Sequence, residues 1–248
     1  MTRTLSRVLA FSITTLIASA ATAQTPAPAQ QPPPMTNLQL YPKETPRAEI
    51  VATMQGFTQA LGVQCTYCHM GQAPNFDFAS DAKPTKTVAR KMILMAREVT
   101  AKMPEITGKP AADITRLRCA TCHRGVAIPK LLPDIVTETV NKSGTAAAIE
   151  QYRDLRKKYY GAQAYDFSEN ALAFLGQQLT NANKPDEALA LLQLNAEYYP
   201  NHPATYGMMA QAYMKKNDKD NAIKSLEKAV QLDPNNQQAK RQLEQLKK

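Results

Sequence analysis

The sequence predicts an all-α protein with two parts, a domain of short helices followed by a helical solenoid. Three observations lead to this prediction. Apolar residues recur at the spacing of amphipathic helices, the alternating pattern of half-buried strands is scarce, and the second half repeats at a spacing of 34 residues between Pro200 and Pro234. With 248 residues, 44% of them hydrophobic, the chain is long enough for one ordinary domain or two small ones.

The N-terminus has the features of a cleaved export signal. Arg3 and Arg7 form a basic start, a largely apolar stretch follows, and Ala21-Thr22-Ala23 matches the small-residue cleavage pattern. We therefore expect a signal peptide over residues 1–23, cleaved after Ala23, and a periplasmic mature protein that is not integral to the membrane. The alternative is an uncleaved anchor. Residues 24–37 begin with QTPAPAQQPPP, which is typical of a Pro-rich linker.

All four cysteines fall within two copies of one short motif, Cys65-Thr66-Tyr67-Cys68-His69 and Cys119-Ala120-Thr121-Cys122-His123. C-x-x-C-H is the attachment signature of c-type haem. Disulfides would be the usual reading of four cysteines in an exported chain, but the motif explains their spacing better. A thioredoxin-like motif needs no His after its second Cys, and a zinc site of four cysteines would leave both adjacent histidines as coincidences.

The spacing within the motif has a physical reason. Residues three apart lie on one face of a helical turn, so both thiols can form thioethers to the two vinyl groups of one haem. The next residue then carries its imidazole under the porphyrin, where it can bind iron. The sequence therefore predicts two covalent c-type haems, with His69 and His123 as axial ligands.

The sixth ligands must come mostly from another residue type, because the chain has only three histidines. His202 is the spare one, and it falls in a turn between repeats, where a surface position is expected. The chain has ten methionines, and His/Met ligation is a common pairing in electron-transfer haems.

A helix with Met on its apolar face is expected before each haem motif. The first spans residues 45–62 and carries Met54; a loop is expected over residues 70–84. The second spans residues 86–102, and its apolar face is expected to be buried. That face carries Val88, Met92, Met95 and Val99. Periodicity alone does not separate Met92 from Met95.

Three segments of the first half carry a resemblance: PRAEIVATMQGFTQALGVQCTYCH, DFASDAKPTKTVARKMILMAREV and CATCHRG, within roughly residues 38–130. They resemble the photosynthetic reaction centre cytochrome c subunit family. The resemblance implies that each haem lies between a Met-donating helix and a C-x-x-C-H helix. It assigns Met54 and Met95 as sixth ligands, with Met92 in reserve and Met103 a weaker candidate. That family's subunit carries four haems and often a lipid-anchored Cys, so the resemblance does not extend to attachment to a reaction centre.

The second half resembles tetratricopeptide repeats. Leu172, Gly176 and Ala188 precede Pro200 as Tyr206, Ala210 and Ala222 precede Pro234, at the 34-residue period of that family. Asn195 departs from the usual small residue. Helices near 145–159 and 236–247 are expected to cover the ends. These features predict a diheme domain over residues 38–141 and a repeat domain over residues 142–248.

Charge and composition restrict the function further. Residues 24–141 carry 13 Lys and Arg against 9 Asp and Glu, and the four propionates of two haems would offset this excess. No basic stripe is interleaved with aromatic residues, which argues against nucleic-acid binding. We expect an electron carrier rather than an enzyme, whose repeats dock a redox partner or build an assembly. The alternatives are a haem enzyme with an open iron site, such as a diheme peroxidase, and a scaffold with structural haems.

Overall fold

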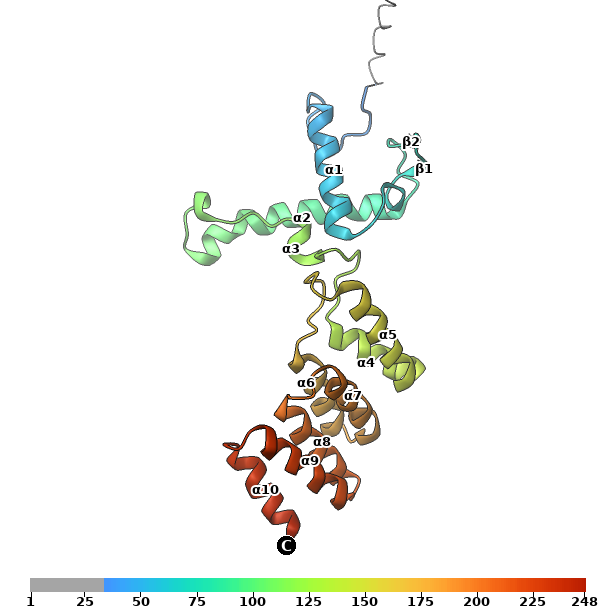
Figure 1. The fold of residues 1–248 in the computed structure, drawn as a ribbon. Coiled ribbons are helices and arrows are strands. Elements are labelled where there is room, and N and C mark those ends of the chain that lie inside the picture. Colours follow the sequence, from blue (N-terminus) through green and yellow to red (C-terminus); the bar gives the residue numbers. More distant parts are fainter. Residues whose placement is uncertain (1–33) are drawn as a thin grey trace, which may run out of the picture. The chain divides into compact units, whose positions relative to one another are not determined.

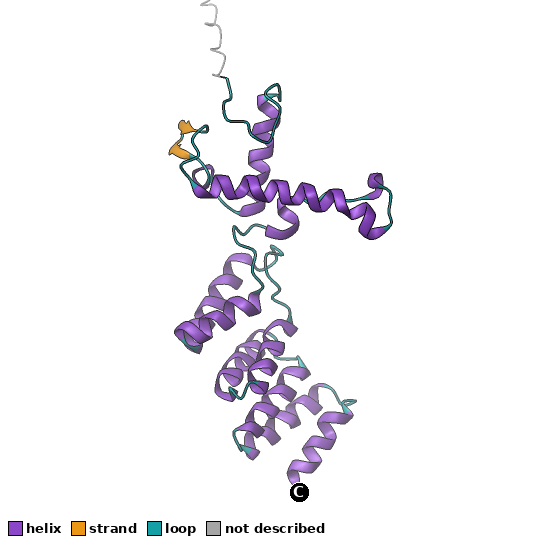
Figure 2. Ribbon diagram, turned by 180° about the vertical axis from the view of Figure 1, so that it is seen from behind, coloured by secondary structure: helices purple, strands orange, loops and turns teal. Residues whose placement is uncertain are grey.

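The computed structural model describes residues 34–248 (Figure 1). The expected signal peptide and residues 24–33 of the expected linker lie outside the described residues. The described chain is mostly helical, with a single small hairpin (Figure 2), so the predicted all-α class is confirmed. In residues 34–248 none of the helices combines the length and the apolar character that crossing a membrane would require.

The helix that precedes the first haem motif is α1, Arg47–Leu61. Pro46 precedes its first turn, and Gly62 ends it in the left-handed conformation, with φ +64° and its N–H bonded to the carbonyl of Thr58. Gly62 therefore ends the helix where the sequence predicts, whereas the helix begins at Arg47, two residues later than predicted, and no side chain caps it. Ile50 and Ala60 are the buried residues of this helix.

The segment after the first motif differs from the prediction. Residues 70–84 were expected to form a loop, but β1, Met70–Gln72, pairs antiparallel with β2, Asn75–Asp77. Met70 lies opposite Asp77 and Gln72 opposite Asn75. Strands this short carry too few residues for their alternation to be recognised in a sequence.

The next long helix, α2, spans Pro84–Thr107 and is longer than predicted at both ends. Pro84 stands in its first turn, where a missing N–H costs nothing. Pro104 lies inside the helix near its end, and Gly108 terminates it with φ +66°. Two short 3-10 turns, η1 at Cys65–Tyr67 and η2 at Ala111–Asp113, and the short helix α3, Cys119–His123, complete this part of the chain.

Seven helices form the second part of the described chain. They are α4 Leu132–Ser143, α5 Thr145–Tyr159, α6 Glu169–Asn181, α7 Pro185–Tyr198, α8 Pro203–Lys215, α9 Lys219–Leu232 and α10 Gln237–Lys247. Successive helices pack as antiparallel pairs, as in a tetratricopeptide solenoid. Helices α5 and α10 coincide with the predicted end helices.

Helix α4 was not predicted, although Leu132, Val136 and Val140 have helical spacing and Pro133 stands in its first turn. These three side chains are buried in the same apolar cluster as Tyr152 of α5 and other side chains of α5–α8. The expected boundary between residues 141 and 142 therefore falls inside a helix.

Small residues bring the repeat helices together, as the sequence indicated. A Cβ added to Gly176 of α6 would lie 2.5 Å from Cγ of Leu192 on α7, so only glycine allows this approach. A second apolar cluster joins α8, α9 and α10 around the buried Ala210, Leu226 and Ala239.

A polar cluster lies inside the solenoid and corrects one expectation. His202 was expected at the surface but is buried, with 8% of its area exposed. Its Nδ1 lies 2.9 Å from Oγ1 of Thr205, and Asn195 donates to the same hydroxyl at 2.7 Å and to the carbonyl of Glu169 at 2.8 Å. Asn195 replaces a small residue because its amide joins α7 to both α6 and α8.

Candidate haem site

The first C-x-x-C-H motif is wound into a tight turn. The N–H groups of Cys68 and His69 donate to the carbonyl of Cys65 at 3.3 and 3.0 Å, within and directly after η1. The turn brings the two cysteines and the histidine into one short loop of backbone. Cys65 is exposed and Cys68 is half-buried.

The imidazole of His69 is half-buried beside an aromatic side chain. Its ring meets the ring of Phe78 edge-on, with centroids 5.0 Å apart. Burial, together with the nearby charges of Lys86 and Arg90, lowers the pKa of His69. The neutral imidazole that results is the form that binds a metal ion. Its Nδ1 is buried without a hydrogen-bond partner.

Lys86 fixes the chain segment that carries Phe78. The ammonium group is largely buried and donates to the carbonyls of Phe78, Ala79 and Ser80 at 2.9, 3.0 and 2.8 Å. It also forms an ion pair with Asp81 at 3.0 Å. A buried ammonium with all its donors used is a rigid anchor, so α2 holds the β2 end of this segment against the first motif.

Asp81 is the acceptor at the centre of this arrangement. Arg90 donates to its carboxylate at 2.9 Å and Asn37 at 2.9 Å. Hydrogen bonds from Arg90, Asn37 and Lys86 hold the pKa of Asp81 well below its usual range. The carboxylate therefore stays ionised and keeps the N-terminal end of the described chain on α2.

The second motif forms the helix α3. The N–H of Arg118 donates to the hydroxyl of Thr121 at 3.1 Å and so caps the helix. His123 is buried, and its Nδ1 lies 3.0 Å from the carbonyl oxygen of Val126. With the proton on Nδ1 this contact is a hydrogen bond, and Nε2 is left with a lone pair for a metal.

Helix α2 is attached to both motifs. Near its start, Thr85 donates to the carbonyl of Tyr67 at 2.5 Å, within the first motif. Further along, the hydroxyl of Thr100 accepts the N–H of Leu117 at 3.1 Å, just before the second motif. At the usual rise of an α-helix the two threonines are about 22 Å apart along its axis.

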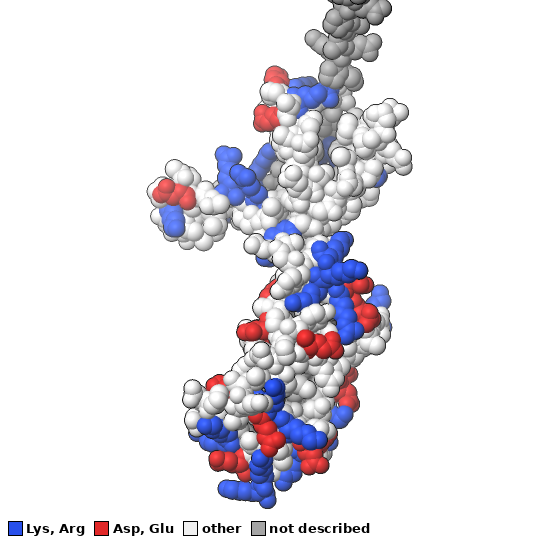
Figure 3. All heavy atoms as spheres, in the orientation of Figure 1, with Lys and Arg blue, Asp and Glu red and all other residues white. Residues whose placement is uncertain are grey.

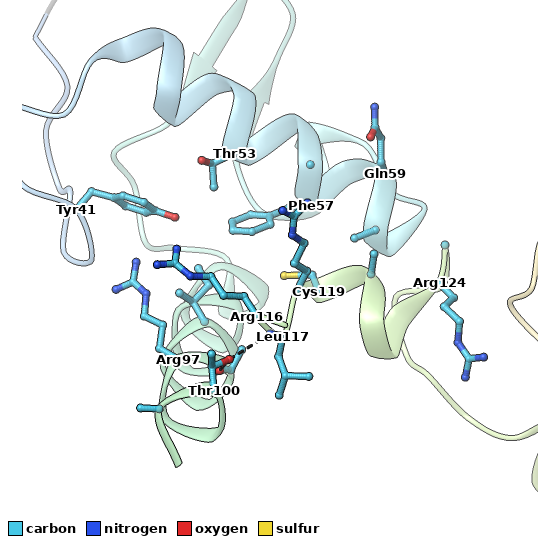
Figure 4. A pocket seen from close by; sticks show the side chains of 18 of the residues that line it. Tyr41, Thr53, Phe57, Gln59, Arg97, Thr100, Arg116, Leu117, Cys119 and Arg124 are labelled. Atoms are coloured by element: carbon cyan, nitrogen blue, oxygen red, sulfur yellow. Dashed lines mark hydrogen bonds between the residues drawn. The ribbon is translucent and has the colours of Figure 1, made fainter. Parts of the chain in front are cut away.

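A cavity of about 1200 Å³ opens between α1, α2 and α3 (Figure 4). Phe57 of α1, Thr100 of α2 and Leu117 line it, and the sulfur of Cys119 faces it. The second motif therefore presents its first cysteine to a space of the size that a cofactor needs.

The residues present fit covalently bound haem. In residues 34–130 the buried apolar side chains are only Ile50, Ala60 and Val126, far too few to form a core. Many large apolar side chains are instead exposed, and the face seen in Figure 3 carries few charges around α1 and the hairpin. A porphyrin would supply the missing apolar contacts, and the free imidazole edges would supply its ligands.

The same residues do not fit the rival sites. All four cysteines are free thiols, so this part of the chain forms no disulfide. Among residues 34–248 no group of three or more Cys, His, Asp or Glu side chains is placed to hold a metal ion. A zinc site made of the four cysteines therefore has no support in the geometry.

The candidate methionines lie outside the lining of the cavity. Met54 is half-buried on α1 and Met103 half-buried on α2. Met92 and Met95 are 36% and 48% exposed, and none of the four lines the cavity. The expectation of a buried face on α2 was wrong for the protein alone, because no other segment of the described chain covers this face. Val88 and Val99 on that face are exposed too.

Sequence reasoning missed the side chains that line the cavity from outside the motifs, chiefly Arg97 and Arg116. Arg97 is two residues from Met95 and therefore lies on the opposite face of α2. Helical periodicity could have shown that it does not belong to the methionine face. Arg116 comes from an irregular segment, whose position no sequence pattern indicates.

Comparison with known proteins agrees with this geometry. The profile of the family described as "Photosynthetic reaction centre cytochrome C subunit" matches residues 53–217, and a tetratricopeptide repeat profile matches residues 203–236. The chain is 32% identical over 113 residues to the photosynthetic reaction center cytochrome c subunit of Rubrivivax gelatinosus, covering 38% of this chain and 30% of that protein. It is 40% identical over 77 residues to cytochrome c-554 of Chloroflexus aurantiacus, covering 31% of this chain and 17% of that one.

The chain thus spans less than a third of the length of either relative. The family profile, in contrast, covers well over half of the chain and includes the second half of α1, both C-x-x-C-H motifs and the first repeats. The chain therefore belongs to the photosynthetic reaction centre cytochrome c subunit family, whose members are c-type cytochromes.

Proposed function

We propose that this protein is a periplasmic electron carrier with two covalently bound c-type haems. The observation that carries the proposal is the pair of C-x-x-C-H motifs. Both are hydrogen-bonded to α2, and they are joined to each other where the end of α1 contacts the turn after α3. Cys65 and Cys68 would bind one haem, and Cys119 and Cys122 the other. Export belongs to the proposal, because c-type haem is attached outside the cytoplasm.

When bound, each haem supplies a one-electron Fe(III)/Fe(II) couple. The protein's part is to hold and tune it. His69 and His123 would provide the proximal ligands, and the hydrogen bond from His123 to Val126 would fix that ring's orientation and tautomer. Phe78 would play the corresponding steric role beside His69.

Met54 and Met95 remain our proposed sixth ligands, with Met92 in reserve. Their support is chemical, because His202 is committed to Thr205 inside the solenoid and so is removed from the ligand set. The exposure of Met92 and Met95 leaves both thioethers accessible to a bound group. With His and Met as the two axial ligands of each iron, no coordination position is open to a substrate. We therefore expect electron transfer and no catalysis.

The tetratricopeptide part would dock the redox partner or build an assembly. The tetratricopeptide repeat match over residues 203–236 supports this role, because such repeats commonly bind other proteins. On the face seen in Figure 3 positive and negative side chains are mixed over α6–α10. Domain limits of about 38–130 for the diheme part and 131–248 for the repeats complete the proposal.

Spectroelectrochemistry of the purified holoprotein tests this function. We expect two one-electron transitions and low-spin spectra in both oxidation states. A high-spin iron that binds cyanide or peroxide readily would contradict the electron-carrier proposal and favour a haem enzyme.

A further inference from the structure

The cavity beside Cys119 has an unusual charge. Four arginines line it, Arg97, Arg116, Arg118 and Arg124, and no Asp or Glu does. Guanidinium groups stay protonated in proteins, so this open cavity carries a local excess of positive charge. Such a charge attracts anions.

Two of these arginines are aimed into the space. Figure 4 shows Arg97 and Arg116 on the same side of the cavity, near Tyr41, whereas Arg124 points away. Arg97 donates to the carbonyl of Leu40 at 3.3 Å, and its guanidinium carbon lies 5.6 Å from the centre of the Tyr41 ring. These contacts orient Arg97 without neutralising it.

Neither arginine has a carboxylate partner among residues 34–248, although other cations of α2 do. Arg90 pairs with Asp81 at 2.9 Å and Lys102 with Glu98 at 2.7 Å. Lys91, on α2 outside the cavity, has no ion pair among these residues either, so position rather than the lack of a partner distinguishes the cavity arginines. The guanidinium groups of Arg97, on a regular helix, and of Arg116, just before the Cys119 motif, are therefore available to bind an anionic ligand.

We propose that Arg97 and Arg116 bind the two propionates of the haem attached at Cys119 and Cys122. The inference rests on the proposed function and deepens it. A propionate is a carboxylate, which a planar guanidinium can bind through two parallel N–H donors. Each of the two guanidinium groups can neutralise one carboxylate, and the two propionates account for part of the positive excess of this region. Both side chains are positioning residues for the haem, not ligands of its iron.

The pairing has a measurable consequence for the redox equilibrium. A positive charge beside the porphyrin disfavours the ferric state, and a paired propionate stabilises that state less than a bare one does. Loss of either arginine should therefore shift one haem toward the ferric form. The freed propionate should also titrate nearer neutral pH, so that haem's potential should gain a pH dependence.

The test uses the full-length holoprotein with Arg97→Gln and, separately, Arg116→Gln. Each should shift the ferric/ferrous equilibrium of one haem about tenfold, which is 59 mV for one electron, and leave the other nearly unchanged. Arg97→Lys should retain most of the original potential, because it keeps the charge. Lys91→Gln is the matched control, since it removes an exposed charge from the same helix outside the cavity and should produce a much smaller shift.

The outcomes are distinguishable. If intact mass shows no haem at Cys119 and Cys122, the proposed function fails. If the haem is present and both Gln variants behave like Lys91→Gln, the function stands and the inference is overturned. A potential in the unaltered protein that depends on added inorganic phosphate would show that a soluble anion occupies the arginines, which would also overturn it.

Discussion

Gly125 donates its backbone N–H to the carbonyl oxygen of Ala60 at 2.8 Å, which joins the end of the second haem motif to the helix that leads into the first. Gly62 lies beside this bond, and a Cβ there would overlap the carbonyl oxygen of Gly125 and lie 2.9 Å from its carbon. The two motifs are thus in direct backbone contact. In a diheme protein this contact would fix how the two cofactors are placed relative to each other.

The contact makes Gly62 more than a helix terminator. Gly62→Ala must adopt φ +64° and also displace Gly125, whereas Gly108→Ala must adopt φ +66° with open space around the new methyl group. We expect Gly108→Ala to cost about 1 kcal/mol of stability and Gly62→Ala about 3 kcal/mol. Denaturant unfolding of the two holoproteins measures the difference. Equal losses would mean that the Gly62–Gly125 contact yields without strain.

The methionine ligands can be tested by exchange for a different ligand. Met54→His and Met95→His should each lower the potential of one haem and leave the other nearly unmoved, because thioether ligation favours ferrous iron relative to imidazole. Met92→His is the matched comparison one helical turn away. If Met92→His rather than Met95→His moves the potential, Met92 is the ligand. If none of the three variants does, these residues are packing residues.

The repeat part should fold without the haem part when it is cut at the right place. A fragment of residues 131–248 should be helical and haem-free, and it should unfold cooperatively. A fragment of residues 142–248 loses Leu132, Val136 and Val140 from the core and should be less stable by several kcal/mol. Circular dichroism during thermal unfolding compares the two. Equal stability would return the boundary to residue 141.

Tyr152 gives the solenoid a defined response to alkaline pH. Burial raises the pKa of its phenol to about 12, even though Arg156 acts in the opposite direction. In the unfolded chain the phenol ionises near pH 10, so between about pH 10 and 12 only the folded state keeps the proton and stability falls as pH rises. Tyr152→Phe should remove about 2 kcal/mol of this loss.

The readout is denaturant unfolding of the full-length protein at several pH values over that window. The control replaces the exposed Tyr160 by Phe, which removes a phenol of the same part of the chain without touching the buried one. An unchanged slope in Tyr152→Phe would show that the phenol ionises without opposing the fold.

The elements predicted well from the sequence are those with local causes. Helix α1 follows from its apolar spacing and Gly62, and the haem motifs are complete within five residues each. The burial of His202 could not be predicted, because it depends on the packing of α7 against α8, where Asn195 donates to the Thr205 hydroxyl that His202 also contacts. The periodicity of the sequence predicted an apolar face on α2, but it does not indicate which segment or bound group covers that face.

The residues that line the cavity could not be predicted for the same reason. Cys119 was predicted as a haem residue, but Arg97 and Arg116 come from separate segments, and only the packing of α1, α2 and α3 brings them together. The hairpin at residues 70–77 was missed for a similar reason. Its place depends on Lys86, which holds the chain just beyond β2 through three backbone carbonyls.

The most direct test of the account is the intact mass of the purified full-length protein under denaturing conditions, after expression with the machinery that attaches c-type haem. We expect the polypeptide mass plus two haems that acid-acetone does not extract. Cys65→Ala with Cys68→Ala, and separately Cys119→Ala with Cys122→Ala, should each leave one. A protein that carries no covalent haem, or that retains two after either change, would contradict the central claim.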